Sequence, residues 1–464
     1  MSNVLSSQLI DKFLVEARSR ISDNPHDRLS EKTKIALKQN NFVFDAHCHV
    51  FDGQCIDPKY FIVRALGATD KPLLKFLLEK LVSKVLKEKT YKSTDDLIED
   101  IYDKGVVEFD ADIKNFFDKV AKEVDKELSS RKKLGENKER LLARIKEVIE
   151  ILKSNSMEAI YKKFHDNYSI RNVDVHKGKT LITILLGMDI QPGWEGSIMK
   201  DYATQTQELG KLAEKHAVLP FLPIDPRRFE NKKDKKFNEL WDAFLDAFDK
   251  DKPSFYGIKL YPSLGYLPSD ERIQPILQIC AEKGIPVTAH CGGEMVSTFK
   301  KSIEVNRFGV KATISEKSRK LNSRKLNEPT EWIKVLEKHP KLHLNLGHFG
   351  GVEAWKAKNH ATSHRIKTIL EMMNNSKGKV FTDFSFNLND KKASVNFMKV
   401  LNSNIEHERI VKKRCMFGTD FWVVLPMSDI KKDQAYFSEI TTGSHYAIFK
   451  DNVLDYLGIR VGEL

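Results

Sequence analysis

Short apolar runs that alternate with amphipathic stretches are the feature that most constrains the fold of this chain. Seven such runs follow residue 178, at residues 181–189, 217–225, 255–262, 285–290, 342–348, 379–385 and 414–420. The run FVFDAHCH at residues 42–49 adds an eighth. Apolar runs of this length between helical stretches are typical of βα units. Eight parallel strands in such units close a barrel, so the sequence predicts the α/β fold class and a (β/α)8 TIM barrel.

The connection between the first and second runs is too long for a simple βα unit. Within it, Lys- and Glu-rich stretches carry apolar residues three and four positions apart, which is typical of helices, at residues 71–89, 110–133 and 137–153. We expect a large helical insertion between strands one and two that caps the barrel, with a docking or dimerisation module as the alternative. The predicted parts are an N-terminal helix and the first barrel strand at residues 1–53, the insertion at residues 54–178 and the remainder of the barrel at residues 179–464.

A smaller insertion is expected after the fifth strand. Residues 294–328 are rich in Lys and Arg, which predicts a mobile basic loop near the barrel mouth. Its charges either attract an anionic substrate or only keep the loop solvated. Two glycines predict helix ends, Gly284 after residues 272–283 and Gly458 in the last helix, which we expect to close the barrel.

Composition excludes several classes of protein. The formal net charge is +12, but the lysines are scattered among glutamates along helical stretches, so we expect solvated helix faces and no nucleic-acid partner. The five cysteines show no paired spacing, which predicts free thiols in a reducing compartment and a cytoplasmic location. No export signal and no run of about 18 uncharged apolar residues occurs, so no membrane span is expected.

Polar side chains stand at the ends of several predicted strands. In a barrel of this type the active site is built at the C-terminal ends of the strands. His47 and His49 end strand one, and side chains alternate along a strand, so both are expected to face the barrel axis. The other strand-end candidates are Lys259 in strand four, His290 in strand five, His348 in strand six and Asp420 in strand eight.

Two buried imidazoles side by side are costly unless a partner uses their lone pairs, and a divalent metal ion is such a partner. We predict His47, His49, His290 and Asp420 as ligands of one ion that keeps a position for water. Zinc is the expected ion, with manganese and iron as alternatives. Such an ion lowers the pKa of its water to about 7. Asp420 is then expected to accept a proton from the water, and His348 to exchange a proton with the substrate.

Other polar residues are weaker candidates. Arg227, in the motif DPRR at residues 225–228, either binds a substrate carboxylate or only anchors its own loop. Asp383 and Ser385 end strand seven, where a structural role and a substrate contact both stay open. Cys48 is expected to point away from the axis, and Cys291 has no recognisable base for a nucleophilic role.

Four motifs carry a family resemblance: DAHCH at residues 45–49, PVTAH at 286–290, LGHFGG at 346–351 and GTDF at 418–421. With them the chain resembles the amidohydrolase superfamily. The nearest resemblance is to the amidohydrolase-2 family of metal-dependent barrel hydrolases, which includes aminocarboxymuconate-semialdehyde decarboxylase. The resemblance covers residues 42–53 and 179 to about 460, and it leaves the helical insertion unexplained.

The resemblance implies a mononuclear site with His47, His49, His290 and Asp420 as ligands. It implies that His348 transfers a proton or polarises the substrate carbonyl. In dinuclear relatives a lysine at the place of Lys259 is carboxylated and bridges two metals. Here the resemblance favours an unmodified lysine that contacts the substrate or tunes its charge.

Three functions are compatible with these residues. The first is an enzyme, a metal-dependent hydrolase of a C–N or C–O bond in an amide, lactone or ester, in which His348 or Lys259 stabilises the oxyanion. The second is a metal-dependent non-oxidative decarboxylase of a small carboxylic acid, which would use the same ligands. The third is a non-catalytic protein on a relic barrel, and the complete ligand set disfavours it. The expected partner is a small-molecule substrate, anionic if the basic loop contributes, and similar proteins are often homodimers.

Overall fold

The structure is a computed structural model. It describes residues 5–57, 154, 156–168, 179–194, 198–230, 235–292, 296–298, 300–356, 363–376, 378–386, 390–421, 443 and 446–464. All eight predicted strands lie within these ranges, whereas the helices predicted at residues 71–89, 110–133 and 137–153 lie outside them.

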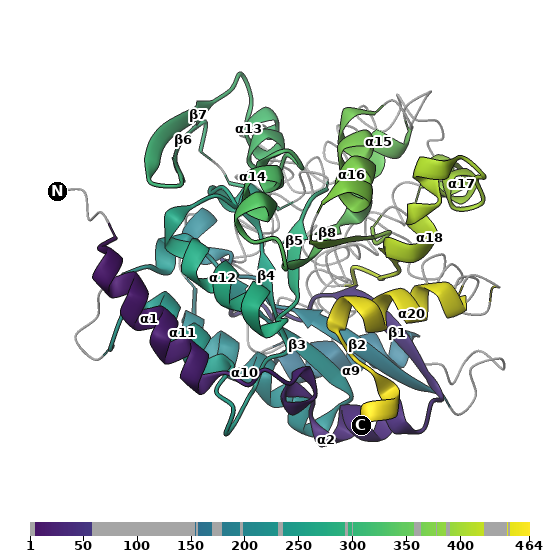
Figure 1. Cartoon of the computed structure of the whole chain (residues 1–464), viewed down its shortest axis with the longest axis horizontal. Helices are drawn as coiled ribbons and strands as arrows, with labels where there is room; N and C mark the ends of the chain where they lie inside the picture. The colour runs from purple at the N-terminus through teal and green to yellow at the C-terminus, as the bar shows by residue number, and fades with distance from the viewer. Residues whose placement is uncertain are drawn as a thin grey trace, which may run out of the picture.

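Eight parallel strands form one sheet that curls into a nearly closed barrel, and the predicted fold is confirmed (Figure 1). In order around the barrel they are β1 (Phe42–Cys48), β2 (Thr180–Leu186), β3 (Val218–Ile224), β4 (Gly257–Leu260), β5 (Val287–His290), β8 (His343–Gly347), β9 (Lys379–Asp383) and β10 (Cys415–Met416). Backbone hydrogen bonds from Ala46 N to Phe417 O (2.9 Å) and from Asp420 N to His47 O (2.7 Å) join the first strand to the last. These bonds close the ring.

The helices surround the strands, and Figure 1 shows α1 lying along α11 and α12. They are α1 (Ser7–Arg20), α2 (Glu31–Lys38), α9 (Met157–Tyr168), α10 (Tyr202–Lys215), α11 (Glu239–Ala247), α12 (Gln274–Lys283), α13 (Arg319–Leu326), α14 (Glu331–Lys338), α15 (Val352–Lys356), α16 (His364–Asn375), α17 (Lys391–Leu401), α18 (Ile410–Arg414) and α20 (Tyr446–Leu457). The predicted helix ends at Gly284 and Gly458 are present, each glycine with a positive φ. Across the described ranges, none of the helices has the length and apolarity needed to cross a membrane.

The apolar residues form two separate layers. One core lies between the strands and the surrounding helices. The other fills the interior of the barrel, with inward-facing residues such as Phe44, Ile184 and Phe221. Helix α20 closes the N-terminal end of this interior, where the Tyr456 hydroxyl lies 2.8 Å from the hydroxyl of Thr288. The interior is therefore packed below the strand ends, and its C-terminal end is left for polar groups.

Strand β1 contains an irregularity that changes which residues face the interior. Phe42 and Phe44 belong to the interior core, so regular alternation would turn His47 outward. The register slips between Asp45 and Cys48, where β1 has one residue more than β2 opposite it. Such a bulge re-aims the side chains that follow it. His47 and His49 both reach the interior as predicted, and Cys48 packs in the outer layer, also as predicted.

Residues 294–328 are not the loop that the sequence predicted. They contain an antiparallel hairpin, β6 (Ser302–Arg307) and β7 (Val310–Ser315), followed by α13. Ile303, Val305 and Ile314 bury one face of the hairpin in a small core of its own. The two-residue turn uses Phe308 and Gly309 with positive φ angles of 49° and 91°, which is the turn geometry that matches strand twist.

Helix α9 is the described helix of the predicted insertion. Its residues Met157, Ile160, Tyr161 and Phe164 are buried in the outer core. The ring of Phe164 lies 4.9 Å from that of Phe421, next to β1. Helix α9 thus lies where a (β/α)8 barrel places the crossover helix between its first two strands.

Candidate metal centre

Three of the predicted ligands meet at the C-terminal end of the barrel. His47 Nε2 lies 3.6 Å and His49 Nε2 lies 3.5 Å from the same oxygen, Oδ1 of Asp420. The three atoms lie within 4.8 Å of one another, and all three residues are buried. Within the described part of the chain, Asp420 Oδ1 has no hydrogen-bond partner. Two nitrogens and one carboxylate oxygen therefore converge on a single point.

Hydrogen bonds on the far side of each imidazole fix which nitrogen carries the proton. His47 Nδ1 lies 2.9 Å from Asp383 Oδ2, and His49 Nδ1 lies 2.8 Å from the carbonyl oxygen of Leu186. Carboxylate and carbonyl oxygens only accept, so both Nδ1 atoms donate, and the lone pairs are on the Nε2 atoms. Those are the atoms that face Asp420 and that a metal ion needs.

His348 and His290 lie next to this cluster and contact each other. His348 Nε2 is 3.1 Å from His290 Nδ1, and the ring of His348 lies 4.5 Å from that of His47. The ring of His290 stacks on Tyr261 at 4.1 Å. His290 is not part of the group of three atoms that converge at Asp420. Its role as a fourth ligand, like the roles assigned to the other site residues, stays a prediction.

Lys259 reaches the cluster from β4. Its Nζ lies 3.3 Å from His47 Nε2, and the residue is buried. Since His47 Nδ1 donates to Asp383, His47 Nε2 accepts from the Lys259 amine. One lone pair cannot serve a lysine proton and a metal ion together, so a cation at His47 Nε2 would displace Lys259 from this contact.

Burial sets the charges in the cluster. Burial lowers the pKa of His47, and lowers the pKa values of His49 and His348 well below the ordinary value, which favours the neutral form of each ring. Burial raises the pKa of Asp420 well above its usual value, and the nearby Lys259 offsets this only in part. Burial also lowers the pKa of Lys259 to about 8. A divalent cation would favour the ionised form of Asp420 over the protonated form.

Glycines and strained residues shape the backbone around the cluster. A Cβ at Gly418 would lie 2.4 Å from His47 Cβ, and a Cβ at Gly292 would lie 2.6 Å from His348 Cβ. Asp420 and His348 themselves have positive φ angles of 53° and 67°. Residues other than glycine rarely adopt this conformation, and when they do they concentrate at functional sites.

Two carboxylates hold the site in place: Asp45, which the sequence analysis did not single out, and Asp383, for which it left a structural role and a substrate contact open. Asp45 Oδ1 accepts from the backbone amides of His47 (3.1 Å) and Thr419 (3.0 Å), and Asp45 Oδ2 accepts from the Thr419 hydroxyl (2.6 Å). Burial raises the pKa of Asp45 to about 7, although these donors lower it. Asp383 contacts both His47 and His348. Their positions were the signal available in the sequence: Asp45 stands two residues before His47, and Asp383 stands at the end of a strand.

The residues present fit a divalent cation. The two Nε2 lone pairs are oriented by their Nδ1 partners, Asp420 Oδ1 is a buried acceptor with no donor in the described residues, and the donors are of the type that zinc and similar ions bind. The second group of potential ligands, formed by His47, His348 and Asp383, fits less well, because both Asp383 oxygens already accept hydrogen bonds.

The weaker candidates have local partners. Arg227 forms a two-pronged pair with Asp225, with Nε 2.8 Å from Oδ1, and donates from Nη1 to the carbonyl oxygen of Leu264 at 3.0 Å. Arg228 forms a similar pair with Asp189. Burial raises the pKa of the Cys291 thiol to about 11, which disfavours the nucleophilic thiolate. The two arginines of the DPRR motif thus bind both within their own loop, at Asp225, and to the segments of Leu264 and Asp189.

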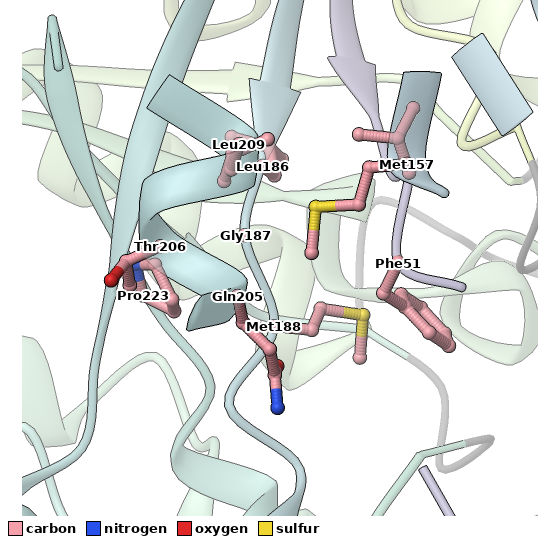
Figure 2. Close-up of a pocket in the computed structure, with 10 residues that line it drawn as sticks. Phe51, Met157, Leu186, Gly187, Met188, Gln205, Thr206, Leu209 and Pro223 are labelled. Carbon is pink, nitrogen blue, oxygen red and sulfur yellow. The ribbon is translucent and has the colours of Figure 1, made fainter. Parts of the chain in front are cut away.

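A small pocket opens behind the strand ends and is separate from the metal cluster. Figure 2 shows Met157 and Met188 extending into the space between Phe51 and the α10 residues Gln205 and Leu209. Its lining is mostly apolar and contains none of the predicted ligands. It adjoins the cluster through Val50, the residue after His49, and through Leu186, whose carbonyl oxygen accepts from His49 Nδ1.

Comparisons with known proteins agree with the strand-end motifs. A crystal structure from Pseudomonas putida, proposed to be a 2-pyrone-4,6-dicarboxylic acid hydrolase, is 10% identical, with a TM-score of 0.39 over 64% of this chain and 86% of that one. A TM-score this low does not by itself define a shared fold. Comparison with curated protein sequences gave no match. Residues 244–458 match the model of the amidohydrolase family, and this range carries Lys259, His290, His348 and Asp420. Over residues 244–458 the chain is therefore similar to the amidohydrolase family.

Proposed function

We propose that this protein is a metal-dependent hydrolase that breaks a C–N or C–O bond in an amide, lactone or ester. One observation carries the proposal: the lone pairs of His47 Nε2 and His49 Nε2 converge with Asp420 Oδ1, which has no hydrogen-bond partner among the described residues, at the C-terminal end of a packed barrel. The match of residues 244–458 to the amidohydrolase family model supports it.

His47, His49 and Asp420 would hold the ion, with His290 as the fourth ligand. Zinc fits this donor set, and manganese and iron are the alternatives. When bound, such an ion supplies Lewis acidity, polarising a substrate carbonyl and lowering the pKa of water to about 7.

The side chains around the ion would divide the remaining tasks. Asp420 accepts a proton from the attacking water, because its carboxylate is buried with an oxygen free of protein donors in the described residues. His348 would exchange a proton at Nε2, because its Nδ1 is already bonded to the Ser385 hydroxyl at 2.9 Å. For proton transfer, Nε2 exchanges its contact with His290 for a contact with the substrate. Lys259, displaced from His47, stabilises negative charge on the substrate oxygen.

The experiment combines metal analysis with activity on a panel of small esters, lactones, amides and carboxylic acids. The purified protein is expected to contain about one divalent ion and to hydrolyse at least one class of the panel. A chelator should abolish the activity and added zinc or manganese should restore it. Release of carbon dioxide without hydrolysis would identify a decarboxylase and contradict the proposal. A protein that stays ion-free after exposure to zinc, manganese and iron would contradict both reactions.

Paired histidine variants separate catalysis from folding. His348→Ala should lower kcat by roughly 100- to 10,000-fold, the usual contribution of a general acid or base. His343→Ala is the matched control, because His343 begins β8, the strand that leads to His348, is partly buried, and pairs with the Tyr456 carbonyl at the opposite end of the barrel. Equal losses in the two variants would contradict a chemical role for His348.

A further inference from the structure

Asp383, at the C-terminal end of β9, is a shared acceptor for the groups around the site. Its Oδ2 accepts from His47 Nδ1 (2.9 Å) and from Asn345 Nδ2 (2.7 Å). Its Oδ1 accepts from the backbone amides of His348 (3.1 Å) and Ser385 (3.2 Å) and from the Ser385 hydroxyl. The carboxylate is fully buried, and each of its two oxygens has at least two donors.

These bonds determine the proton positions in both neighbouring histidines. The Ser385 hydroxyl donates its only proton to Asp383, so it accepts from Nδ1 of His348 at 2.9 Å. His348 Nε2 then carries the lone pair and accepts from His290 Nδ1. On the other oxygen, His47 donates from Nδ1 and keeps its lone pair on Nε2. A single carboxylate therefore sets the tautomer of His47 directly and that of His348 through Ser385.

We propose that Asp383 is a positioning residue that fixes His47 for metal binding and His348 for proton transfer, and so links the two halves of the site. The inference rests on the proposed function, since it assigns His47 to the metal ion and His348 to the substrate. It adds a requirement for an ionised carboxylate at the end of β9, which contacts neither the ion nor the substrate.

The acceptor-only character of a carboxylate explains why the residue would have to be acidic. An asparagine in its place has one oxygen and one amide nitrogen that donates. Whichever way the amide turns, its nitrogen faces donors, either His47 and Asn345 or the amides of His348 and Ser385. Turned toward His47, it would favour the other imidazole tautomer and remove the lone pair from Nε2.

A purely structural role for Asp383 predicts a different outcome. The carboxylate would then stabilise the end of β9, and its loss would lower stability without changing metal affinity in the protein that remains folded. Asp189→Asn is the matched control, because Asp189 is also a buried carboxylate that follows a strand, three residues after β2, and its side-chain bonds among the described residues go to Arg228.

The experiment titrates metal-free protein with Co²⁺ and follows its visible absorption. Asp383→Asn is expected to bind Co²⁺ about 10- to 100-fold more weakly than the unsubstituted protein, the usual effect of removing a partner of a metal-bound histidine. Asp189→Asn should bind Co²⁺ with unchanged affinity even if its thermal unfolding temperature falls. Equal Co²⁺ affinity in Asp383→Asn and the unsubstituted protein would overturn the inference while leaving the proposed function intact. An unsubstituted protein that binds no Co²⁺ and no Zn²⁺ would overturn both.

A second variant keeps the inference testable if Asp383→Asn does not fold. Ser385→Ala cuts only the arm that leads to His348 and leaves the bond between Asp383 and His47 in place. With ¹⁵N-labelled histidine, its spectrum should show a changed tautomer at one imidazole, and its Co²⁺ affinity should be unchanged. Unchanged imidazole shifts in Ser385→Ala would overturn the assignment of His348.

Discussion

A methyl group added at Gly418 tests whether the contacts that close the barrel also position the metal site. A Cβ at this position would lie 2.4 Å from His47 Cβ, 2.7 Å from His47 N and 2.9 Å from His47 Cα. Carbon atoms pack at about 3.5–4.0 Å, so the two segments would have to separate by roughly 1 Å. The atoms in the way belong mainly to the backbone of β1 and cannot rotate aside.

The separation acts on two hydrogen bonds that flank Gly418. These are the bonds from Ala46 N to Phe417 O and from Asp420 N to His47 O. We expect Gly418→Ala to lower the free energy of unfolding by about 1–3 kcal/mol, the usual cost of overpacking. Because it also moves His47 relative to Asp420, activity should fall by about 100-fold, the order expected for a 1 Å misplacement.

The assay is denaturant unfolding of the metal-free protein together with Co²⁺ titration of the folded protein. Gly462→Ala is the matched control, because a Cβ at Gly462 meets nothing within 4 Å and Gly462 lacks the positive φ of Gly458. This control should be unchanged or slightly more stable. If Gly418→Ala matched Gly462→Ala in both unfolding free energy and Co²⁺ affinity, the close approach of Gly418 to His47 would be refuted.

Three further predictions concern stability. Asp45→Asn should lower the free energy of unfolding, measured with denaturant, by about 1–3 kcal/mol. Asp45 accepts hydrogen bonds from His47 and Thr419, and the amide nitrogen of asparagine would place a second donor against one of these buried donors. Zinc at about 100 times its Kd should raise the unfolding free energy by about 2.7 kcal/mol, and His49→Ala should abolish this gain in a thermal melt. Burial lowers the pKa of His339 to about 4 from an ordinary value of 6.5, so the unfolded chain takes up a proton before the folded chain does. Stability should therefore be complete above about pH 6.5 and fall by up to about 3 kcal/mol toward pH 4, and in His339→Gln this slope should be smaller by that amount.

The strands could be predicted because each is a local apolar run. The runs at residues 285–290 and 342–348, for example, became β5 and β8, with His290 and His348 at their C-terminal ends as expected. Because parallel strands end at one edge, this placed chemically active residues together without any knowledge of their contacts. The hairpin at residues 302–315 was missed, since its turn places Phe308, an unusual turn residue, at a positive φ.

The orientation of the side chains could not be predicted in the same way, because it depends on partners far apart in the sequence. His47 and Asp383 are 336 positions apart, and Asp45 and Thr419 are 374 positions apart. No periodicity in a single segment reports such pairs. Arg227 shows the opposite case, since its carboxylate partner Asp225 is only two residues away in the same short motif.

The bulge in β1 joins these observations into one argument. Phe42 and Phe44 must face the interior to fill it, and without the extra residue between Asp45 and Cys48 the same alternation would place His47 in the outer layer. The segment around Gly418 stabilises the bulged conformation, because Asp45 binds Thr419 on the outer side while the His47 carbonyl binds the Asp420 amide. The contacts that close the barrel are thus the contacts that bring His47 to Asp420. A substitution that opens this seam should therefore weaken metal binding even when it touches no predicted ligand.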